Sequence, residues 1–201
     1  MNAIDPQEQW NLLIGGDGVT TSDTYEIVDP ATTQVIGHAP EATVADAEAA
    51  ITAANQALPA WRDMPVDDRC ALLGRLADIL AERSGDWAPL VQAETGATMK
   101  IAQTLQLGGT FVDRFRYYSK PRDLDVAEKP MTAGASALGP AGLVGAVVHR
   151  QPVGVVACIT PYNFPLVNVA GKIAPALAMG NTCIIKPAPQ DPLGILRLGR
   201  A

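Results

Sequence analysis

One residue suited to chemistry is Asn163, which lies in the segment PYNFP at positions 161–165, directly after an apolar run. The two prolines that bracket it restrict the backbone, so the side-chain amide can be held in one direction. An amide NH₂ donates hydrogen bonds without changing its charge, which suits the stabilisation of a developing oxyanion. The alternative is an asparagine that hydrogen-bonds to the backbone of its own turn.

Two lysines lie close to this segment. Lys186 ends the apolar run TCIIK and precedes Pro187, so it could donate hydrogen bonds to sugar hydroxyls or to a phosphate. Its structural alternative is a solvated lysine at a strand end. Lys172 interrupts an otherwise apolar helical pattern, so it must reach the surface along its own aliphatic stem, pair with an acid, or face a wet cavity.

The cysteines offer no comparable chemistry. Cys70, Cys158 and Cys183 are odd in number and widely spaced, and the only histidines are His38 and His149, so neither a disulfide framework nor a zinc-ligand spacing is present. Cys158 and Cys183 fall inside apolar runs, where a thiol behaves as a small hydrophobic group with a raised pKa. We therefore predict reduced, mostly buried thiols, no nucleophile among them, and no metal site.

The segment around the candidate residues has the pattern strand, helix, strand. The run GVVACIT at 154–160 is short, apolar and rich in β-branched residues, which indicates a strand covered on both faces. A helical pattern follows over 167–180, and TCIIK forms the next strand. This order predicts a parallel crossover, whose ligands lie beyond the carboxyl ends of the strands. The loops at 160–165 and 186–192 are therefore the predicted site.

The first part of the chain must support this unit. Short strands are predicted at 11–15, 25–28 and 34–38, the last two forming a hairpin. Thr43 and Asp46 then form a capping box, which starts a helix. Its apolar stripe consists of Val44, Ala47, Ile51, Ala54 and Leu58.

Three further helices are predicted before a change in composition. They cover 66–83, 86–96 with Pro89 in the first turn, and 98–119. Residues 121–145 are rich in Gly, Ala, Ser and Pro, and 143–149 reads as a strand. We therefore divide the chain into a lead-in of strands and helices (1–120), an excursion (121–150) and a crossover unit (151–201).

Composition limits the possible functions. The 201 residues are 48% hydrophobic and 18% charged, which is typical of a globular chain. A formal net charge of −6 without a basic run argues against nucleic-acid binding. Apolar stretches end well before the roughly 18 residues of a membrane span, and the acidic first residues are unlike a secretory signal. We expect a cytoplasmic protein with no membrane or nucleic-acid partner.

The segment ITPYNFPLVNVAGKIAPALAMGNTCIIKPAPQDP resembles the aldehyde dehydrogenase superfamily. The upstream segments VDPATTQVIG, PAWR, LADILAER and ETGAT resemble the N-terminal region of the same family, so the resemblance covers nearly the whole chain. It implies an α/β fold in which the helices precede the start of a Rossmann-like parallel sheet. The chain corresponds to less than half of the family's usual length, so this fold would be incomplete.

The resemblance also implies a reaction. In this family a cysteine thiolate attacks an aldehyde, hydride passes to NAD or NADP, and the thioester is hydrolysed or transferred to another acceptor. Asn163 matches the amide that stabilises the oxyanion, and Lys172 matches a lysine that some members use in a proton relay. The positions implied for cofactor binding are Ile159, Thr160, Pro161, Tyr162, Asn163, Lys186, Ala188 and Pro189.

Two departures from the family pattern affect these expectations. Lys186 matches the residue that reaches the adenosine ribose. Pro189 stands where many members have a ribose-binding Glu, so the sequence does not decide between NAD and NADP as the cofactor. The catalytic cysteine and the general-base Glu have no counterpart, so we expect this chain alone not to oxidise an aldehyde. The resemblance implies a homo-oligomer, a dimer or tetramer, for a complete enzyme, with the 121–150 excursion as an oligomerisation-type arm. Two alternatives are a non-catalytic module that binds nucleotide or other subunits, and an incomplete record of a longer protein.

Overall fold

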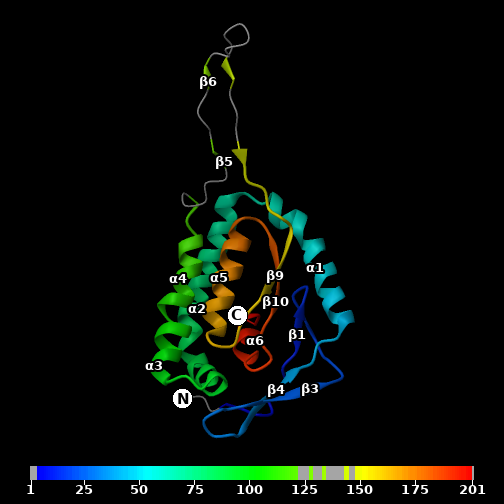
Figure 1. Cartoon of the computed structure of the whole chain (residues 1–201), viewed down its shortest axis with the longest axis vertical. Coiled ribbons are helices and arrows are strands. Elements are labelled where there is room, and N and C mark those ends of the chain that lie inside the picture. Colours follow the sequence, from blue (N-terminus) through cyan, green and yellow to red (C-terminus); the bar gives the residue numbers. More distant parts are fainter. Residues whose placement is uncertain (1–3, 122–126, 129–132, 135–142, 145–147, 201) are drawn as a thin grey trace.

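The computed structural model describes residues 4–121, 127–128, 133–134, 143–144 and 148–200. Figure 1 shows α2, α4 and α5 side by side, with strands β9 and β10 between this group and α1. The architecture is α/β, as predicted. None of the helices in the described ranges has an apolar stretch sufficient to cross a membrane.

Two small antiparallel sheets open the chain. Strand β1 (Leu12–Ile14) lies within the strand predicted at 11–15. It pairs with β2 (Asp17–Val19), a strand that the sequence analysis did not predict. Gly15 and Gly16 make the turn between them with φ of 64° and 97°, a region that favours glycine. Strand β3 (Thr24–Val28) pairs with β4 (Val35–Pro40), which confirms the predicted hairpin.

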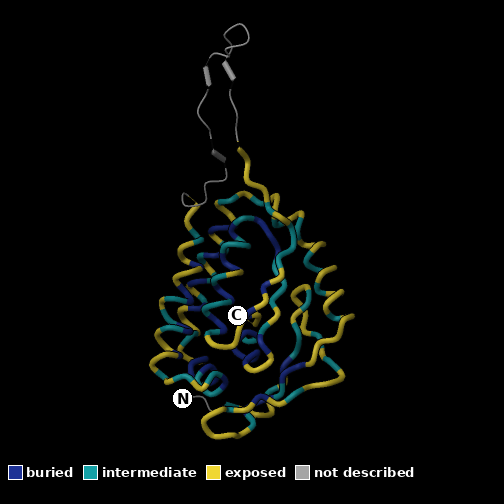
Figure 2. Tube along the Cα trace, in the orientation of Figure 1, coloured by how far each residue is buried: buried dark blue, intermediate teal, exposed yellow. Residues whose placement is uncertain are grey.

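Helix α1 (Val44–Asp63) begins at the predicted capping box, since the Asp46 N–H donates to Thr43 Oγ1 and the Thr43 N–H donates to Asp46 Oδ2. It contains no buried residue, and its stripe is largely exposed, with Val44 at 77% and Ile51 at 47%. Figure 2 shows α1 as exposed or half-buried along its length, whereas the inner faces of the other long helices are buried. The helix contacts the sheet through Thr182 Oγ1, which donates to the Ala54 carbonyl at 3.0 Å.

Helix α2 runs without interruption from Val66 to Thr95, so the predicted break between residues 83 and 86 is wrong. Pro89 lies inside the helix, where it removes one backbone hydrogen bond. Buried Trp87 and Val91 on either side of it provide tertiary packing that outweighs this local cost. The predicted end is confirmed, because Gly96 adopts φ +67° and its N–H donates to the Gln92 carbonyl.

The single helix predicted over 98–119 is three pieces, which corrects that prediction. They are α3 (Met99–Ile101), the π-helical turn η1 (Ala102–Gln106) and α4 (Gly109–Tyr118). The Leu107 N–H donates to the Ala102 carbonyl, five residues back. A Cβ at Gly108 would lie 2.6 Å from the Gln103 and Thr104 carbonyl oxygens, so the close turn requires glycine there.

Two hydrophobic clusters hold these elements together. The larger lies between α2, α4 and α5 and includes the fully buried Phe111 and Phe115, whose rings meet edge to face at 5.7 Å. The smaller joins the first segment, β3, β4 and α2 to α6 (Leu193–Leu198). It consists of Trp10, Ile27, Ile36, Ala39, Leu90 and Leu193. Together they pack the lead-in against the last fifty residues.

The predicted crossover is confirmed. Strand β9 (Val155–Ile159) leads through α5 (Pro165–Ala178) to β10 (Thr182–Lys186), and the two strands are parallel. A short helix, α6 (Leu193–Leu198), follows. The expectation that β9 is covered on both faces is wrong for this chain, since Ile159 is 64% exposed and Ala157 is also exposed.

The excursion lies mostly outside the described residues. Its described parts are short strands: β5 (Ala127–Glu128) pairs with β8 (Val148–His149), and β6 (Ala133–Gly134) pairs with β7 (Leu143–Val144). The strand predicted over 143–149 therefore corresponds to β7 and β8, and its residues 145–147 are not described. Its predicted role as an oligomerisation arm stays a prediction.

Candidate functional site

The two predicted site loops leave the sheet at one edge. Ile159, the last residue of β9, is the register partner of Lys186, the last residue of β10. One residue further, the Thr160 N–H donates to the Lys186 carbonyl at 3.1 Å, so the pairing continues to the point where the loops diverge. The carboxyl ends of parallel strands are where α/β sheets bind ligands.

The first loop exposes most of its predicted residues. Pro161 and Asn163 are exposed, and Tyr162 is 61% exposed. Among the described residues, none forms a hydrogen bond with the Asn163 amide, so the alternative in which it caps its own turn is not adopted. The loop's Phe164 carbonyl is bonded by Asn168 of helix α5 (Pro165–Ala178), whose Nδ2 donates to it at 2.8 Å. The Asn163 amide is therefore available to a ligand.

Thr160 differs from its neighbours because it is only 4% exposed. Its backbone is fixed by the hydrogen bond to Lys186, while its Oγ1 is buried and has no hydrogen-bond partner in the described residues. A buried hydroxyl without a partner carries a free-energy cost. Thr160 therefore places an unsatisfied polar atom at the start of this loop.

The second loop begins at Lys186. Its side chain is exposed, and Nζ donates to the neighbouring Pro187 carbonyl at 3.1 Å. Ala188 is buried and Pro189 is exposed. Proline has no side-chain acceptor, so Pro189 can contribute only packing and its backbone carbonyl to a ligand here.

The other end of the crossover is fixed by Asn181. Its Oδ1 accepts a hydrogen bond from the Gly154 N–H at 3.0 Å, and its Nδ2 donates to the Ala176 carbonyl at 3.1 Å. Asn181 is buried and follows Gly180, whose φ is +83°. This one side chain thus joins the end of α5 to the residue before β9, and so holds the register on which the loops depend.

Lys172 lies on the exposed surface of α5, which matches the alternative in which it reaches solvent. Its charge contributes to lowering the pKa of Cys158, but the main cause is a hydrogen bond from the Cys183 thiol, and the result is a pKa of about 7. The prediction of a raised pKa at Cys158 is therefore wrong. The prediction is confirmed for Cys183, where the same hydrogen bond and burial raise the pKa. Burial also raises the pKa of Cys70, for which no shift was predicted.

The cysteines are free, as predicted, with Cys70 and Cys158 buried and Cys183 half-buried. Cys158 and Cys183 lie on the face of the sheet that packs against the larger hydrophobic cluster. In the described part of the chain, no group of three or more His, Cys, Asp or Glu side chains could hold a metal ion.

Sequence reasoning missed two buried acidic residues, one on α2 and one within the second loop. Glu94 is 4% exposed and Asp191 is 2% exposed. Burial raises the pKa of Glu94 to about 8 and that of Asp191 to about 7. Burial, with the charges of Glu41, Glu94 and Asp191, also raises the pKa of Tyr25 to about 12. A signal was present, because Glu94 follows Trp87 and Val91 at the spacing of a buried helical stripe.

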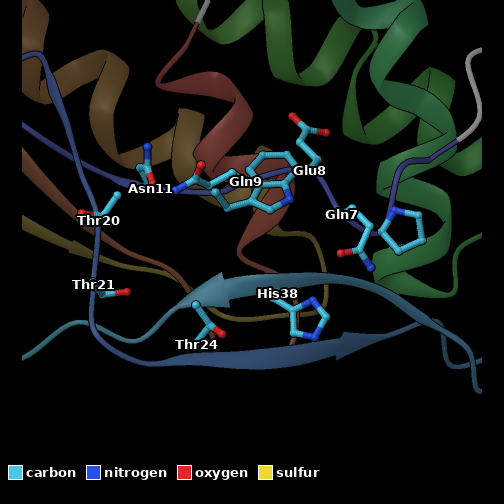
Figure 3. A pocket seen from close by; sticks show the side chains of 10 residues that line it. Gln7, Glu8, Gln9, Asn11, Thr20, Thr21, Thr24 and His38 are labelled. Carbon is cyan, nitrogen blue, oxygen red and sulfur yellow. The ribbon is translucent and has the colours of Figure 1, made fainter.

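A separate pocket of about 350 Å³ lies between the first segment and the β3–β4 hairpin. Figure 3 shows Thr24 and His38 on this hairpin and Gln7, Glu8, Gln9 and Asn11 on the first segment. Its lining is mostly polar, and none of the predicted site residues contributes to it. The pocket is therefore distinct from the edge at which Thr160 and Lys186 meet.

Fold and site together define an α/β protein whose parallel crossover presents two loops at one edge of the sheet. A model described as "Aldehyde dehydrogenase family" matches residues 19–201, and this chain belongs to that family. A mitochondrial aldehyde dehydrogenase of Leishmania tarentolae is 39% identical over 193 residues, which cover 95% of this chain and 37% of that protein. The chain thus spans less than two-fifths of the length of this relative.

Solved structures of aldehyde dehydrogenases are also similar to this chain. The NAD⁺ complex of an aldehyde dehydrogenase from Bacillus cereus has a TM-score of 0.86 and 31% identity, covering 97% of this chain and 39% of its own. An NADP-dependent enzyme from E. coli has a TM-score of 0.85 and 29% identity, covering 96% of this chain and 38% of its own. This chain is therefore similar to the first part of those larger proteins.

Proposed function

We propose that this chain takes part, within a complete aldehyde dehydrogenase, in the oxidation of an aldehyde to a carboxylic acid, or to an acyl thioester, with NAD or NADP. In this proposal the chain supplies the oxyanion amide and the adenosine side of the cofactor site. The supporting observation is that the exposed Asn163 loop and Lys186 leave the same edge of the sheet, joined by the hydrogen bond from Thr160 to Lys186.

The residues at this edge fit a nucleotide. Lys186 has an exposed ammonium group that can donate to ribose hydroxyls or to a phosphate. The buried Thr160 hydroxyl lacks a partner, and Ile159 and Tyr162 offer exposed apolar surface. When bound, NAD or NADP would supply a hydride acceptor. Pro189 offers the ribose no side-chain acceptor, so the site selects neither form through that position.

Asn163 would act on the substrate. A neutral NH₂ donor on a loop fixed by prolines can stabilise negative charge that develops on a carbonyl oxygen, and it needs no proton transfer to do so. Lys172 lies nearby in sequence on the exposed side of α5, and we propose that it takes part in moving a proton to solvent. Its charge already influences Cys158.

None of the cysteines in this chain is proposed as the nucleophile. Cys158 has the lowest pKa of the three, but it is 1% exposed and faces the hydrophobic cluster, where no aldehyde can reach it. Cys70 is equally buried. We therefore expect the chain alone not to reduce NAD or NADP in the presence of an aldehyde.

Nucleotide binding tests the proposal directly. Calorimetry with NAD, NADP and ADP-ribose is expected to show saturable binding, which Lys186→Gln weakens by about tenfold through loss of one charged donor. Lys100→Gln, which changes an exposed lysine on α3, is the matched control and should bind as the original chain does. Absence of binding for all three nucleotides contradicts the proposal.

A second candidate function is a non-catalytic module that binds nucleotide or assembles with other subunits. The exposed side chains of Val153, at 85%, and Ile159, at 64%, favour it, because they leave apolar surface along β9 uncovered. Such a module would form a stable complex with complete aldehyde dehydrogenase subunits in size-exclusion chromatography. We also propose that the complete enzyme is a homo-oligomer and lies in the cytoplasm.

A further inference from the structure

The buried carboxylate of Glu94 joins the last turn of α2 to the start of α6. Its Oε1 accepts a hydrogen bond from the Leu193 N–H, and its Oε2 accepts one from the Gly194 N–H at 2.9 Å. Glu94 and Gly194 lie 100 residues apart in the sequence. One side chain thus fixes two successive backbone amides at the end of the loop that follows β10.

The surroundings of Glu94 hold this contact in one geometry. A Cβ at Gly194 would lie 3.2 Å from Oε2, so glycine permits the close approach. Leu193 is fully buried in the smaller hydrophobic cluster, beside Trp10 and Ile27. Because a buried carboxyl group is costly unless its oxygens are hydrogen-bonded, the two amide donors make this position tolerable for Glu94, and they oppose the burial that raises its pKa to about 8.

The loop between β10 and α6 is therefore fixed at both ends. Its first end is held by the hydrogen bond between Thr160 and Lys186, and its second end is held by Glu94. Only residues 187–192 lie between these anchors, and among them Pro189 is exposed. With so short a span, we expect a shift of the second anchor to move Pro189 and the Pro187 carbonyl, to which the Lys186 Nζ donates at 3.1 Å, and so to move the Lys186 ammonium although its backbone stays paired.

We propose that Glu94 is a positioning residue for nucleotide binding, which acts by fixing the second end of the 187–192 loop so that Lys186 and Pro189 meet the nucleotide's sugar in the correct geometry. This inference rests on the proposed function, since it requires the nucleotide to lie along this loop. Glu94 itself is buried and does not touch the ligand. It acts through the loop, as supporting residues of binding sites commonly do.

The first test uses an isosteric substitution. Glu94→Gln keeps the side-chain volume but replaces one acceptor oxygen with an NH₂ group that faces a backbone N–H. We expect about tenfold weaker binding of ADP-ribose in calorimetry. We also expect faster hydrogen exchange at the backbone amides of the loop and its second anchor, which belong to Ala188, Gln190, Asp191, Leu193 and Gly194. The matched control is Glu82→Gln, an exposed glutamate on the same helix, which should change neither quantity.

The second test separates positioning from general stability. In a double-mutant cycle, Lys186→Gln is expected to weaken ADP-ribose binding about tenfold in the original chain but less than about threefold in the Glu94→Gln chain, because Lys186 is already misplaced there. Fully multiplicative effects overturn the inference. A lower unfolding midpoint with unchanged affinity also overturns it, because Glu94 would then be only a structural residue.

Failure of the inference can be told apart from failure of the proposed function. If the original chain binds ADP-ribose and Glu94→Gln binds equally well, the inference alone is overturned. If the original chain does not bind any of the nucleotides, the proposed function falls, and the nucleotide role of Glu94 falls with it. Unchanged amide exchange in Glu94→Gln would show, in either case, that Glu94 does not hold the loop.

Discussion

The backbone N–H of Thr160 donates to the carbonyl of Lys186 at 3.1 Å, and this is the last hydrogen bond before the two site loops diverge. It follows the register pair of Ile159 and Lys186, so the position of both loops depends on the pairing of β9 with β10. That pairing is maintained by buried polar contacts at the opposite end of the crossover. The first predictions concern those contacts.

Replacing Asn181 with alanine should destabilise the chain strongly. The substitution removes the acceptor for the Gly154 N–H and the donor to the Ala176 carbonyl, both in a buried turn. Leaving such groups unpaired predicts a loss of about 2–3 kcal/mol in the free energy of unfolding, measured by urea titration. Asn55→Ala, on the exposed surface of α1, is the control and should stay within about 0.5 kcal/mol of the original chain.

Arg69→Lys should also destabilise, although the charge is kept. The Arg69 guanidinium is buried and donates to the Ala178 carbonyl and the Arg62 carbonyl, each at 3.2 Å, and to the Met64 carbonyl. A lysine ammonium cannot reproduce this planar set of donors, so a loss of about 2 kcal/mol is expected in the same titration. Arg75→Lys, exposed on the same helix, should have almost no effect; equal losses for the two variants would contradict this account.

Local patterns in the sequence predicted the parts of the fold that local interactions decide. The capping box of Thr43 and Asp46, the stop at Gly96 and the crossover all follow from a few neighbouring residues, and all are confirmed. The crossover also brings Asn163 and Lys186 to one edge, so the site could be placed without the structure. Their catalytic and binding roles stay proposals.

Features that depend on distant partners could not be predicted. The partners of Glu94 are about 100 residues away, so no local pattern indicates that it anchors α6. The lowered pKa of Cys158 depends on Cys183 in the neighbouring strand. Helix α2 continues through Pro89 because tertiary burial of its neighbours outweighs the local cost.

Replacing two glycines, one within α2 and one at its end, by alanine should change the free energy of unfolding in opposite directions. Gly96 has φ +67°, and a Cβ there would lie 2.7 Å from Pro30 Cγ, so Gly96→Ala should cost about 1–2 kcal/mol of unfolding free energy. Gly85 lies within α2 with nothing within 4 Å of an added Cβ. Gly85→Ala should stabilise by about 0.5–1 kcal/mol through helix propensity. Thermal unfolding of both variants checks the opposite signs.

The stability of the chain should fall as the pH rises from about 4 to about 7, because burial raises the pKa of Asp191 from its usual 3.8 to about 7. The folded state therefore binds this proton more tightly than the unfolded state does. The stabilisation is complete below the usual pKa and is lost as the pH rises through the folded one. The slope is at most about 1.4 kcal/mol per pH unit for one proton.

Asp191→Asn should make this decline shallower, since the variant has no carboxyl to ionise at that position, while Glu94, whose pKa burial raises to about 8, still contributes a decline of its own. The lowered pKa values of Asp29, Asp46 and Asp63 act below about pH 4 and in the opposite direction, so they do not mask the effect. Urea titrations at intervals between pH 4 and 8 measure it, with the exposed Asp68→Asn as the matched control. A profile for Asp191→Asn that declines as steeply as that of the original chain would show that Asp191 ionises as freely in the folded state as in the unfolded one.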